Sequence, residues 1–222
     1  MEELKISSLY RESTRSVAFP YLAHYTYPWE ALAAITQIIE KIVKDLPREE
    51  FYELSPNVWV AKSARIAKSA YIGAPTVICE DAEVRHGAFI RGAAIVGRGA
   101  VVGNSTELKN CILFDGVQVP HFNYVGDSIL GYKAHLGAGA VTSNVKSDKS
   151  YVAVHCYGRT VETGCRKFGA MLGDHVEVGC NSVLNPGTVI GRYTNVYPLS
   201  SVRGYVPSEC IYKSQNSIVK KR

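Results

Sequence analysis

The sequence predicts an all-β solenoid, in which short strands and tight corners alternate along one long stack. Three regularities of the 222 residues lead to this prediction. Aliphatic residues recur at every sixth position, a small residue stands two places before most of them, and glycine often follows them. A period of six fits neither a helix, which repeats every 3.6 residues, nor a half-buried strand, which alternates. Short strands that each point one aliphatic side chain inward do fit.

The aliphatic repeat extends over most of the chain. Its first run is Val60, Ile66, Ile72, Ile78, Val84, Ile90, Val96, Val102 and Leu108. After a one-residue slip it resumes at Leu113, Val119 and Val125, and then at Leu130 and Leu136. It returns at Leu172, Val178, Leu184, Ile190, Val196 and Val202. Stacked coils would share a core of aliphatic ladders, with neighbouring strands about 4.8 Å apart.

The repeat resembles the hexapeptide [LIV]-G-x-x-[STAV]-x of the left-handed parallel β-helix. Ala64, Ala82 and Ala100 are examples of the small residue, and Gly73 and Gly97 of the glycine. The resemblance implies that three hexads make one triangular coil and that the chain forms roughly seven coils. It also implies a homotrimer, because members of this family usually place their active sites between neighbouring prisms.

Residues 1–56 do not follow the six-residue period, and part of this extension has the pattern of a helix. The segment PWEALAAITQIIEKIVKDLP, 28–47, places its apolar residues on one helical face. Pro28 stands at its start and Pro47 provides a stop signal. We expect a short N-terminal helix that packs on the first coil or on a partner.

A second interruption of the repeat lies at 143–169. This segment is expected to form one protruding two-stranded arm that turns near Tyr157 and Gly158. An insertion of this size in a solenoid usually lies over a functional face. The predicted domain organisation is therefore the N-terminal extension, a β-helix over 57–206 that includes the arm, and a C-terminal tail over 207–222.

Composition limits the partners and the compartment. Hydrophobic residues make up 46% and charged residues 20%, and the net charge of +5 suits an anionic small molecule. We expect neither a nucleic-acid partner nor a membrane, because the chain has no long Lys/Arg run and no apolar run of about 18 residues. The absence of a signal-peptide pattern, and six cysteines without a CxxC pair, lead us to expect a cytoplasmic protein with free thiols.

Three longer motifs carry a more specific resemblance. VPHFNYVGDSILGYKAHLGAGAVTSN, 119–144, resembles (V)xHLxYxGDAxIGxxxNxGAGTxTxN in the acetyltransferase domain of bifunctional N-acetylglucosamine-1-phosphate uridyltransferases. FIRGAAIVGRGAVVGNSTELKN, 89–110, is similar to the RPG…VGNxxEIK of that family. CRKFGAMLGDHVEVGCNSVLNPG, 165–187, resembles a signature of archaeal-type sugar-1-phosphate nucleotidylyltransferases that also acetylate amino sugars. The resemblance covers roughly 25–206.

The resemblance implies transfer of an acetyl group from acetyl-CoA to an amino-sugar 1-phosphate. His121 would be the general base, since the pKa of a histidine, about 6.5, suits deprotonation of an amine near neutral pH. Arg91 and Lys109 would hold the phosphate, because guanidinium and ammonium groups both bind phosphate oxygens. The other positions carried over are Tyr124, His135 and Asn144 as sugar contacts, and Ala138, Cys180 and Pro198 along the path of acetyl-CoA.

Departures from the family motifs leave the acceptor sugar open. His135 stands where the bacterial enzymes have an asparagine, and Val145 where they have a tyrosine. Glucosamine-1-phosphate, galactosamine-1-phosphate or a related sugar therefore fits the resemblance. The Gly-rich GxGTRxxP loop of the nucleotidyltransferase half has no counterpart in these residues, so we do not expect this chain to make a nucleotide sugar by itself.

Two alternatives to the acetyltransferase remain at this stage. The zinc carbonic anhydrases share the hexapeptide fold, but their histidine five residues after the second ligand corresponds here to Gly126. His86 and His121 would then lack a third ligand, since His135 falls on a different coil, and we expect no metal. The other alternative is a non-catalytic module that binds a sugar nucleotide or a separate nucleotidyltransferase.

Overall fold

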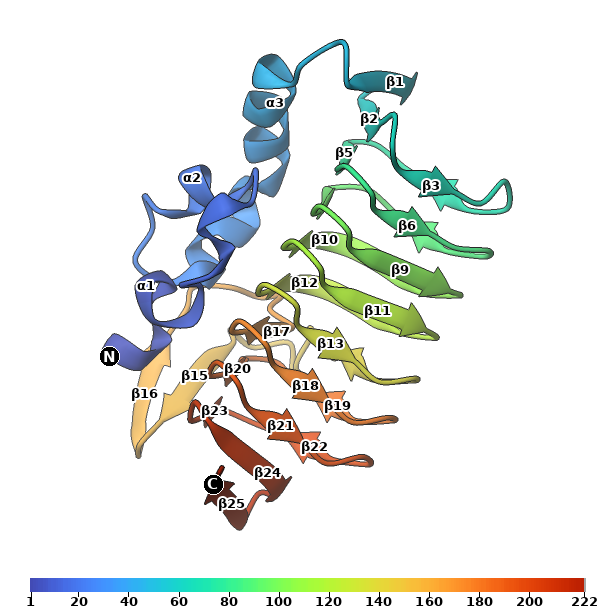
Figure 1. The fold of residues 1–222 in the computed structure, drawn as a ribbon. Helices are drawn as coiled ribbons and strands as arrows, with labels where there is room; N and C mark the ends of the chain where they lie inside the picture. The colour runs from blue at the N-terminus through green and yellow to red at the C-terminus, as the bar shows by residue number, and fades with distance from the viewer. Residues whose placement is uncertain (222) are drawn as a thin grey trace.

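The computed structural model describes residues 1–221, apart from the side chain of Arg15, and forms a three-sided β-solenoid (Figure 1). Short strands stack in register along the axis and are joined by tight corners. The left-handed β-helix that the six-residue repeat predicts is confirmed. Parallel pairing between coils satisfies the backbone N–H and C=O groups that each short strand cannot pair within itself.

Each face of the prism carries seven or eight parallel strands. Face 1 consists of β2 (Val58–Ala61), β5 (Thr76–Ile78), β8 (Ala94–Val96), the second halves of β10 (Glu107–Leu113) and β12 (Tyr124–Leu130), β17 (Ala170–Leu172), β20 (Thr188–Ile190) and β23 (Tyr205–Val206). Face 2 consists of β3 (Arg65–Ile66), β6 (Glu83–Val84), β9 (Val101–Asn104), β11 (Gln118–His121), β13 (His135–Leu136), β18 (Glu177–Val178), β21 (Asn195–Val196) and β24 (Cys210–Ser214). Face 3 consists of β4 (Tyr71–Ile72), β7 (Phe89–Ile90), the first halves of β10 and β12, β14 (Val141–Thr142), β19 (Val183–Leu184) and β22 (Ser201–Val202).

The repeated aliphatic side chains fill the interior of the prism. Val60, Ile78 and Val96 are paired in register on face 1, and none of them is exposed. Burial of one such side chain contributes about 1.5–3 kcal/mol. The ladders therefore fix which side chains point inward, and the residues on either side of each aliphatic point outward.

The edges of the prism turn through left-handed backbone. The edge between faces 2 and 3, called the 2/3 edge, contains Phe122 with a φ of 52°. The edge between faces 3 and 1, called the 3/1 edge, contains Asn110 with a φ of 50° and Asp127 with a φ of 48°. These two edges bound face 3, and every predicted site residue except His135 lies on this face or at one of the two edges.

The N-terminal extension covers face 1 (Figure 1). It contains η1 (Glu2–Leu4), α1 (Ile6–Leu9), η2 (Ser13–Arg15), α2 (Phe19–Leu22), η3 (Pro28–Ala34) and α3 (Ile35–Asp45). Helix α3 buries Ile35, Ile38, Ile39 and Ile42 and contacts β5, β8 and β10, while η3 contacts β12. The expectation was packing on the first coil or on a partner; within this chain the extension lies across several coils, and it leaves the outer sides of faces 2 and 3 open.

The helix predicted over 28–47 is present, but its form and bounds differ. Its first turns, η3, are a 3-10 helix, and the α-helix proper begins at Ile35. The helix ends at Asp45, and Leu46 is extended with a ψ of 131°. The ring of Pro47 explains this end, because proline disfavours the helical conformation in the residue before it.

The arm within 143–169 is the expected two-stranded hairpin. Strands β15 (Ala153–Cys156) and β16 (Arg159–Glu162) pair antiparallel, and the turn has positive φ at Tyr157 and Gly158. Residues Val154 and Cys156 are buried, and Tyr157 contacts Tyr205 of β23 with 5.5 Å between ring centroids. The arm therefore packs against the C-terminal end of face 1, below the N-terminal helices in Figure 1.

Antiparallel strands close both ends of the stack. Strand β1 (Phe51–Ser55) pairs with β2, and β25 (Ser217–Lys220) pairs with β24. The segment 207–222 was expected to be a tail, yet β24 extends face 2 by pairing with β21, because its Tyr212 continues the buried ladder. Residue 222 lies outside the described residues. None of the described helices is long and apolar enough to cross a membrane, and the six cysteines are free.

Candidate functional site

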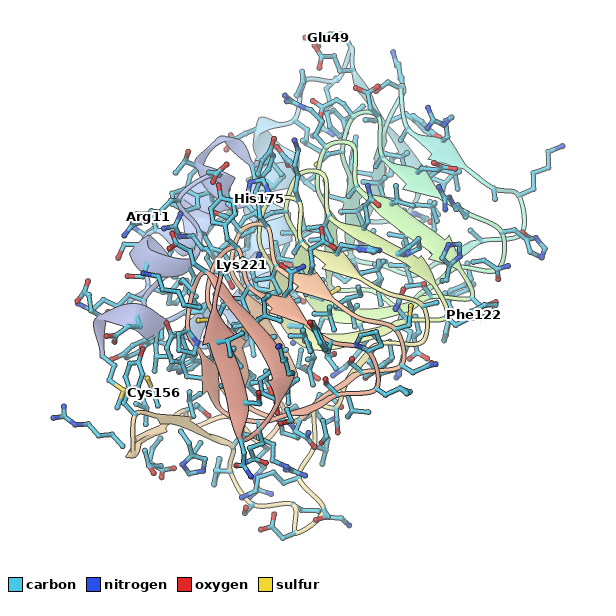
Figure 2. The ribbon with its side chains drawn as sticks, turned by 60° about the horizontal axis from the view of Figure 1, so that its bottom comes forward. Arg11, Glu49, Phe122, Cys156, His175 and Lys221 are labelled. Carbon is cyan, nitrogen blue, oxygen red and sulfur yellow. The ribbon has the colours of Figure 1, made fainter. Side chains whose placement is uncertain are left out.

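His121 ends β11 at the 2/3 edge, and buried hydrogen bonds fix its backbone. The side-chain Oδ1 of Asn123 accepts the His121 N–H at 3.1 Å, and Asn123 is only 3% exposed. The N–H of Gly139 on the next coil donates to the His121 carbonyl at 3.0 Å. The His121 side chain itself is exposed, and the neighbouring Phe122 lies at the rim opposite the N-terminal helices (Figure 2). The imidazole is thus open to a ligand on a rigid backbone.

The three residues predicted along the acetyl-CoA path follow His121 along the 2/3 edge toward the C-terminal end of the stack. The hydrogen bond from Gly139 N–H to the His121 carbonyl places Ala138 on the coil that follows the coil of His121. On the next two coils, Asn181 N–H donates to the Ala138 carbonyl at 2.8 Å, and Leu199 N–H donates to the Cys180 carbonyl at 2.9 Å. Pro198 directly precedes Leu199. The structure therefore brings His121, Ala138, Cys180 and Pro198 into one column.

A second group of predicted residues gathers at the 3/1 edge around Asp127. The Lys109 ammonium lies 3.0 Å from both carboxylate oxygens of Asp127, whose side chain is 5% exposed. Asn144 Nδ2 donates to Asp127 Oδ2 at 2.5 Å, and Asn110 Nδ2 donates to Oδ1 at 2.8 Å. Asp127 thereby orients Lys109 and Asn144, two predicted substrate contacts.

Tyr124 connects the two edges of face 3. Asn144 Nδ2 lies 3.3 Å from its hydroxyl oxygen. A Cβ at Gly126 would lie 2.4 Å from that oxygen, so the ring requires a glycine beneath it. Burial raises the pKa of the Tyr124 phenol, and the Asp127 and Glu107 carboxylates raise it further. The phenol therefore stays protonated near neutral pH and can donate a hydrogen bond.

Arg91 lies beside this group but is paired with a different carboxylate. Its Nη1 donates to Glu107 Oε1 at 2.9 Å, and this hydrogen bond raises the pKa of Arg91. The guanidinium has five N–H donors, so one contact leaves most of them for a ligand. Arg91, Lys109, Tyr124 and Asn144 consequently form one polar surface on face 3.

His135 is not brought to this surface within one subunit. It lies on β13 of face 2, and its Nδ1 is 2.9 Å from Glu177 Oε2. The chain turns the 2/3 edge at Ala138 and Gly139, between His135 and face 3. His86, the other histidine considered as a zinc ligand, lies 2.6 Å from the Ser69 hydroxyl. Within residues 1–221, no group of three or more His, Cys, Asp or Glu side chains is arranged for a metal.

Sequence reasoning did not assign roles to Asp127, Asn110 and Glu107. Asp127 belongs to the YVGD segment of the family motif. Its backbone is left-handed at a corner of the prism, which marks it as a constrained position. A cavity of about 430 Å³ also lies beside this group, lined by Ser143 and Val145, which flank Asn144, and by Lys146, His155 and Arg203. The base of the arm forms one wall of this cavity.

Comparisons with known proteins identify the family. A bifunctional sugar-1-phosphate nucleotidylyltransferase/acetyltransferase of Sulfurisphaera tokodaii is 38% identical over 94 residues, which are 42% of this chain and 23% of that protein. The bifunctional protein GlmU of Methanococcus maripaludis strain C7 is 48% identical over 167 residues, 74% of this chain and 40% of that protein. The chain thus spans less than half the length of these curated relatives.

A solved structure and a family model also match the chain. The acetyltransferase domain of PglB from Neisseria gonorrhoeae, in complex with acetyl coenzyme A, is 16% identical and covers 82% of this chain and 62% of that chain, with a TM-score of 0.34. The family model described as the GMPPB C-terminal domain matches residues 74–192, more than half of the chain. The expected relation to sugar-1-phosphate nucleotidylyltransferases and their acetyltransferase domains is confirmed, and the chain belongs to the family of the GMPPB C-terminal domain.

Proposed function

We propose that this protein transfers an acetyl group from acetyl-CoA to the amino group of an amino-sugar 1-phosphate. The observation that carries the proposal is the arrangement on face 3. An exposed histidine on a fixed backbone stands at one edge, and a cationic and polar group stands at the other. The curated relatives, which are named as nucleotidylyltransferase/acetyltransferase and GlmU proteins, support the same chemistry.

In the proposed reaction His121 acts as the general base. Its neutral imidazole takes a proton from the sugar ammonium, and the freed amine attacks the thioester carbonyl carbon. The carbon–sulfur bond then breaks, the proton on His121 passes to the departing coenzyme A sulfur, and the neutral His121 passes the second proton of the attacking nitrogen to water, which leaves the amide and the thiol. The Gly139 N–H already donates to the His121 carbonyl, so the Ala138 N–H is the donor assigned to the oxyanion.

Arg91 and Lys109 bind the phosphate in this proposal. The two cations lie on adjacent coils of face 3, since the Arg91 N–H donates to the carbonyl of Leu108, next to Lys109. Adjacent coils are about 4.8 Å apart, which suits two contacts to one phosphate group. Tyr124 and Asn144 then face the sugar between the phosphate and His121. Cys180 and Pro198 line the path of the thioester arm and take no chemical part.

His135 reaches the sugar only if a second subunit presents its face 2 to face 3 of the first. Face 1 is covered by the N-terminal extension, whereas faces 2 and 3 are open on their outer sides. The proposal therefore includes a homotrimer in which three identical contacts of this kind close a ring. Sedimentation or light scattering of the purified protein tests this assembly.

The decisive experiment is a thiol-release assay. The purified chain is mixed with acetyl-CoA and either glucosamine-1-phosphate or galactosamine-1-phosphate, and free coenzyme A is followed. His121→Ala should lower the rate by about 100- to 10,000-fold, the range for loss of a general base. His86→Ala is the matched control, because His86 lies on the same 2/3 edge and its side chain hydrogen-bonds Ser69, away from the proposed site.

The non-catalytic alternative predicts a different outcome. If neither acceptor releases thiol and the protein still binds a sugar nucleotide in a titration, the chain is a binding module. If His121→Ala and His86→Ala are both as active as the wild type, the assignment of the base is wrong even though acetyl transfer occurs. A structure with coenzyme A would then locate the base.

A further inference from the structure

Two exposed aromatic side chains form a pair on face 3, next to the proposed phosphate site. Tyr71 on β4 is 60% exposed and Phe89 on β7 is 43% exposed. Their ring centroids are 5.4 Å apart, and the ring planes meet at 56°. Exposed aromatic pairs beside polar residues commonly mark a binding surface.

The pair continues a row of outward-pointing residues that runs through the proposed site. Tyr71, Phe89, Glu107 and Tyr124 are paired in register on successive coils. Phe89 therefore lies two coil steps, about 10 Å, from Tyr124, the proposed sugar contact. Phe89 lies on the same coil as Arg91, and Tyr71 stands one coil further from Tyr124.

A parallel row places the cations beside the aromatic pair. Phe89 and Arg91 belong to the same extended stretch, two residues apart, and so point to the same side of the sheet. The position next to Tyr71 in this second row is Gly73, where a Cβ would lie 2.7 Å from the Arg91 carbonyl. That position therefore has no room for a side chain, and the two aromatic rings and the guanidinium lie together on face 3.

We propose that the site also accepts the nucleoside-diphosphate form of the amino sugar, whose base stacks on Phe89 and Tyr71. This inference rests on the proposed function, which puts the anomeric phosphate at Arg91 and Lys109. A second phosphate and a nucleoside extend from the first phosphate away from the sugar, and that direction leads to the aromatic pair. The unused N–H donors of Arg91 bind the second phosphate. Stacking accepts any base, because every base has a π-face.

The test compares two acceptors that share the same sugar. Acetyl transfer to UDP-glucosamine and to glucosamine-1-phosphate is measured for the wild type, Phe89→Ala and Tyr71→Ala. Each alanine variant should lower kcat/KM for UDP-glucosamine by about 5- to 150-fold and leave that for glucosamine-1-phosphate unchanged. Phe89→Trp should restore the rate. Tyr52→Ala is the control, since Tyr52 is 41% exposed on β1, outside face 3.

Titration with uridine diphosphate tests the same surface, formed by Tyr71, Phe89 and Arg91, without acetyl transfer. Wild-type protein should bind uridine diphosphate, and Phe89→Ala should weaken the binding by a similar factor. Equal binding by the two proteins would overturn the nucleotide inference. So would an equal loss of activity with both acceptors accompanied by a change in subunit number, because the pair would then be a contact between copies of the chain.

The two proposals fail in different ways. Turnover of glucosamine-1-phosphate without any effect of Phe89→Ala on UDP-glucosamine turnover or uridine diphosphate binding would overturn the nucleotide inference alone. Binding of uridine diphosphate through Phe89 with no transfer to either acceptor would overturn the proposed function and support the nucleotide site.

Discussion

Replacement of Asp127 by asparagine should destabilise the fold, although the two side chains have the same shape. The carboxylate accepts hydrogen bonds from Lys109, Asn110 and Asn144, and its side chain is 5% exposed. Asparagine replaces one of the two oxygens with an NH₂ group. Whichever way the amide is turned, its NH₂ group meets either Asn110 or Asn144, together with the Lys109 ammonium.

The size of the effect follows from these contacts. One charged hydrogen bond, worth about 1.5–3 kcal/mol, is lost, and one buried donor loses its acceptor at a cost of about 1–3 kcal/mol. Lys109 is 24% exposed, so water recovers part of its share. The net loss is about 2–4 kcal/mol, which corresponds to a fall in Tm of about 4–16 °C for a chain of this size.

The assay is thermal and urea unfolding followed by circular dichroism. Asp81→Asn is the matched control, because Asp81 is also an aspartate at a prism corner, with a φ of 56°, but its side chain is exposed. Any gain from asparagine in a left-handed conformation is the same at both positions. If Asp127→Asn is within about 0.5 kcal/mol of Asp81→Asn, the buried carboxylate does not hold the cluster together.

Three further predictions concern other parts of the fold. Burial raises the pKa of Asp115 above its unfolded value. The wild type therefore loses stability as the pH rises from the unfolded pKa through the raised folded pKa, whereas asparagine does not titrate. The stability of Asp115→Asn relative to wild type should consequently increase from pH 4 to pH 7 in urea unfolding. Trp29→Ala should cost about 3–5 kcal/mol in the same assay, because Trp29 is 2% exposed and stacks on Tyr27 at 4.6 Å. Gly103→Ala should abolish folding as judged by circular dichroism, because a Cβ there would lie 1.6 Å from the Pro120 carbonyl oxygen.

Each of these predictions has its own contrary result. A stability gap between Asp115→Asn and wild type that widens as pH falls would reverse the sign assigned to burial. Loss of less than about 1 kcal/mol in Trp29→Ala would mean that the N-terminal extension contributes little to the fold. Gly99→Ala is the comparison for Gly103, since Gly99 has a φ of 62° and no atom within 4 Å of its ideal Cβ, so it measures the cost of a left-handed backbone without a clash. If Gly103→Ala is no more damaged than Gly99→Ala, the Pro120 carbonyl oxygen does not exclude a side chain.

The repeating part of the fold is predictable because one residue type at one interval determines which side of each strand is buried. The arm was predictable for a local reason as well, since Tyr157 and Gly158 form a tight turn between two short strands. The short helices before residue 28 were not, because distant contacts hold them. Ser13, for example, donates to Asp174 at 2.6 Å, across 161 positions of sequence.

The site was predictable only in part. The motif spacing marked Arg91, Lys109, Tyr124 and Asn144, and the structure gathers them on one face. Their geometry depends on Asp127, and nothing in a linear pattern shows that this corner carboxylate is buried and holds Lys109 and Asn144. His135 is separated from these four residues because it lies on face 2, on the other side of the 2/3 edge. Its place relative to that edge follows from how the coils stack.

The buried side chain of Asn123 has a consequence for how the proposed reaction is aligned. Its Oδ1 accepts the His121 N–H, while its Nδ2 donates to the Gly137 and Ala140 carbonyls at 2.8 and 3.0 Å. One amide thus fastens the loop that carries the base to the loop that would receive the acyl group. A displacement of either loop carries the other with it, so Asn123, together with the bond from Gly139 N–H to the His121 carbonyl, sets the spacing between the proposed base and the proposed oxyanion donor. The spacing is therefore fixed locally by Asn123, and it does not depend on the number of coils in the stack.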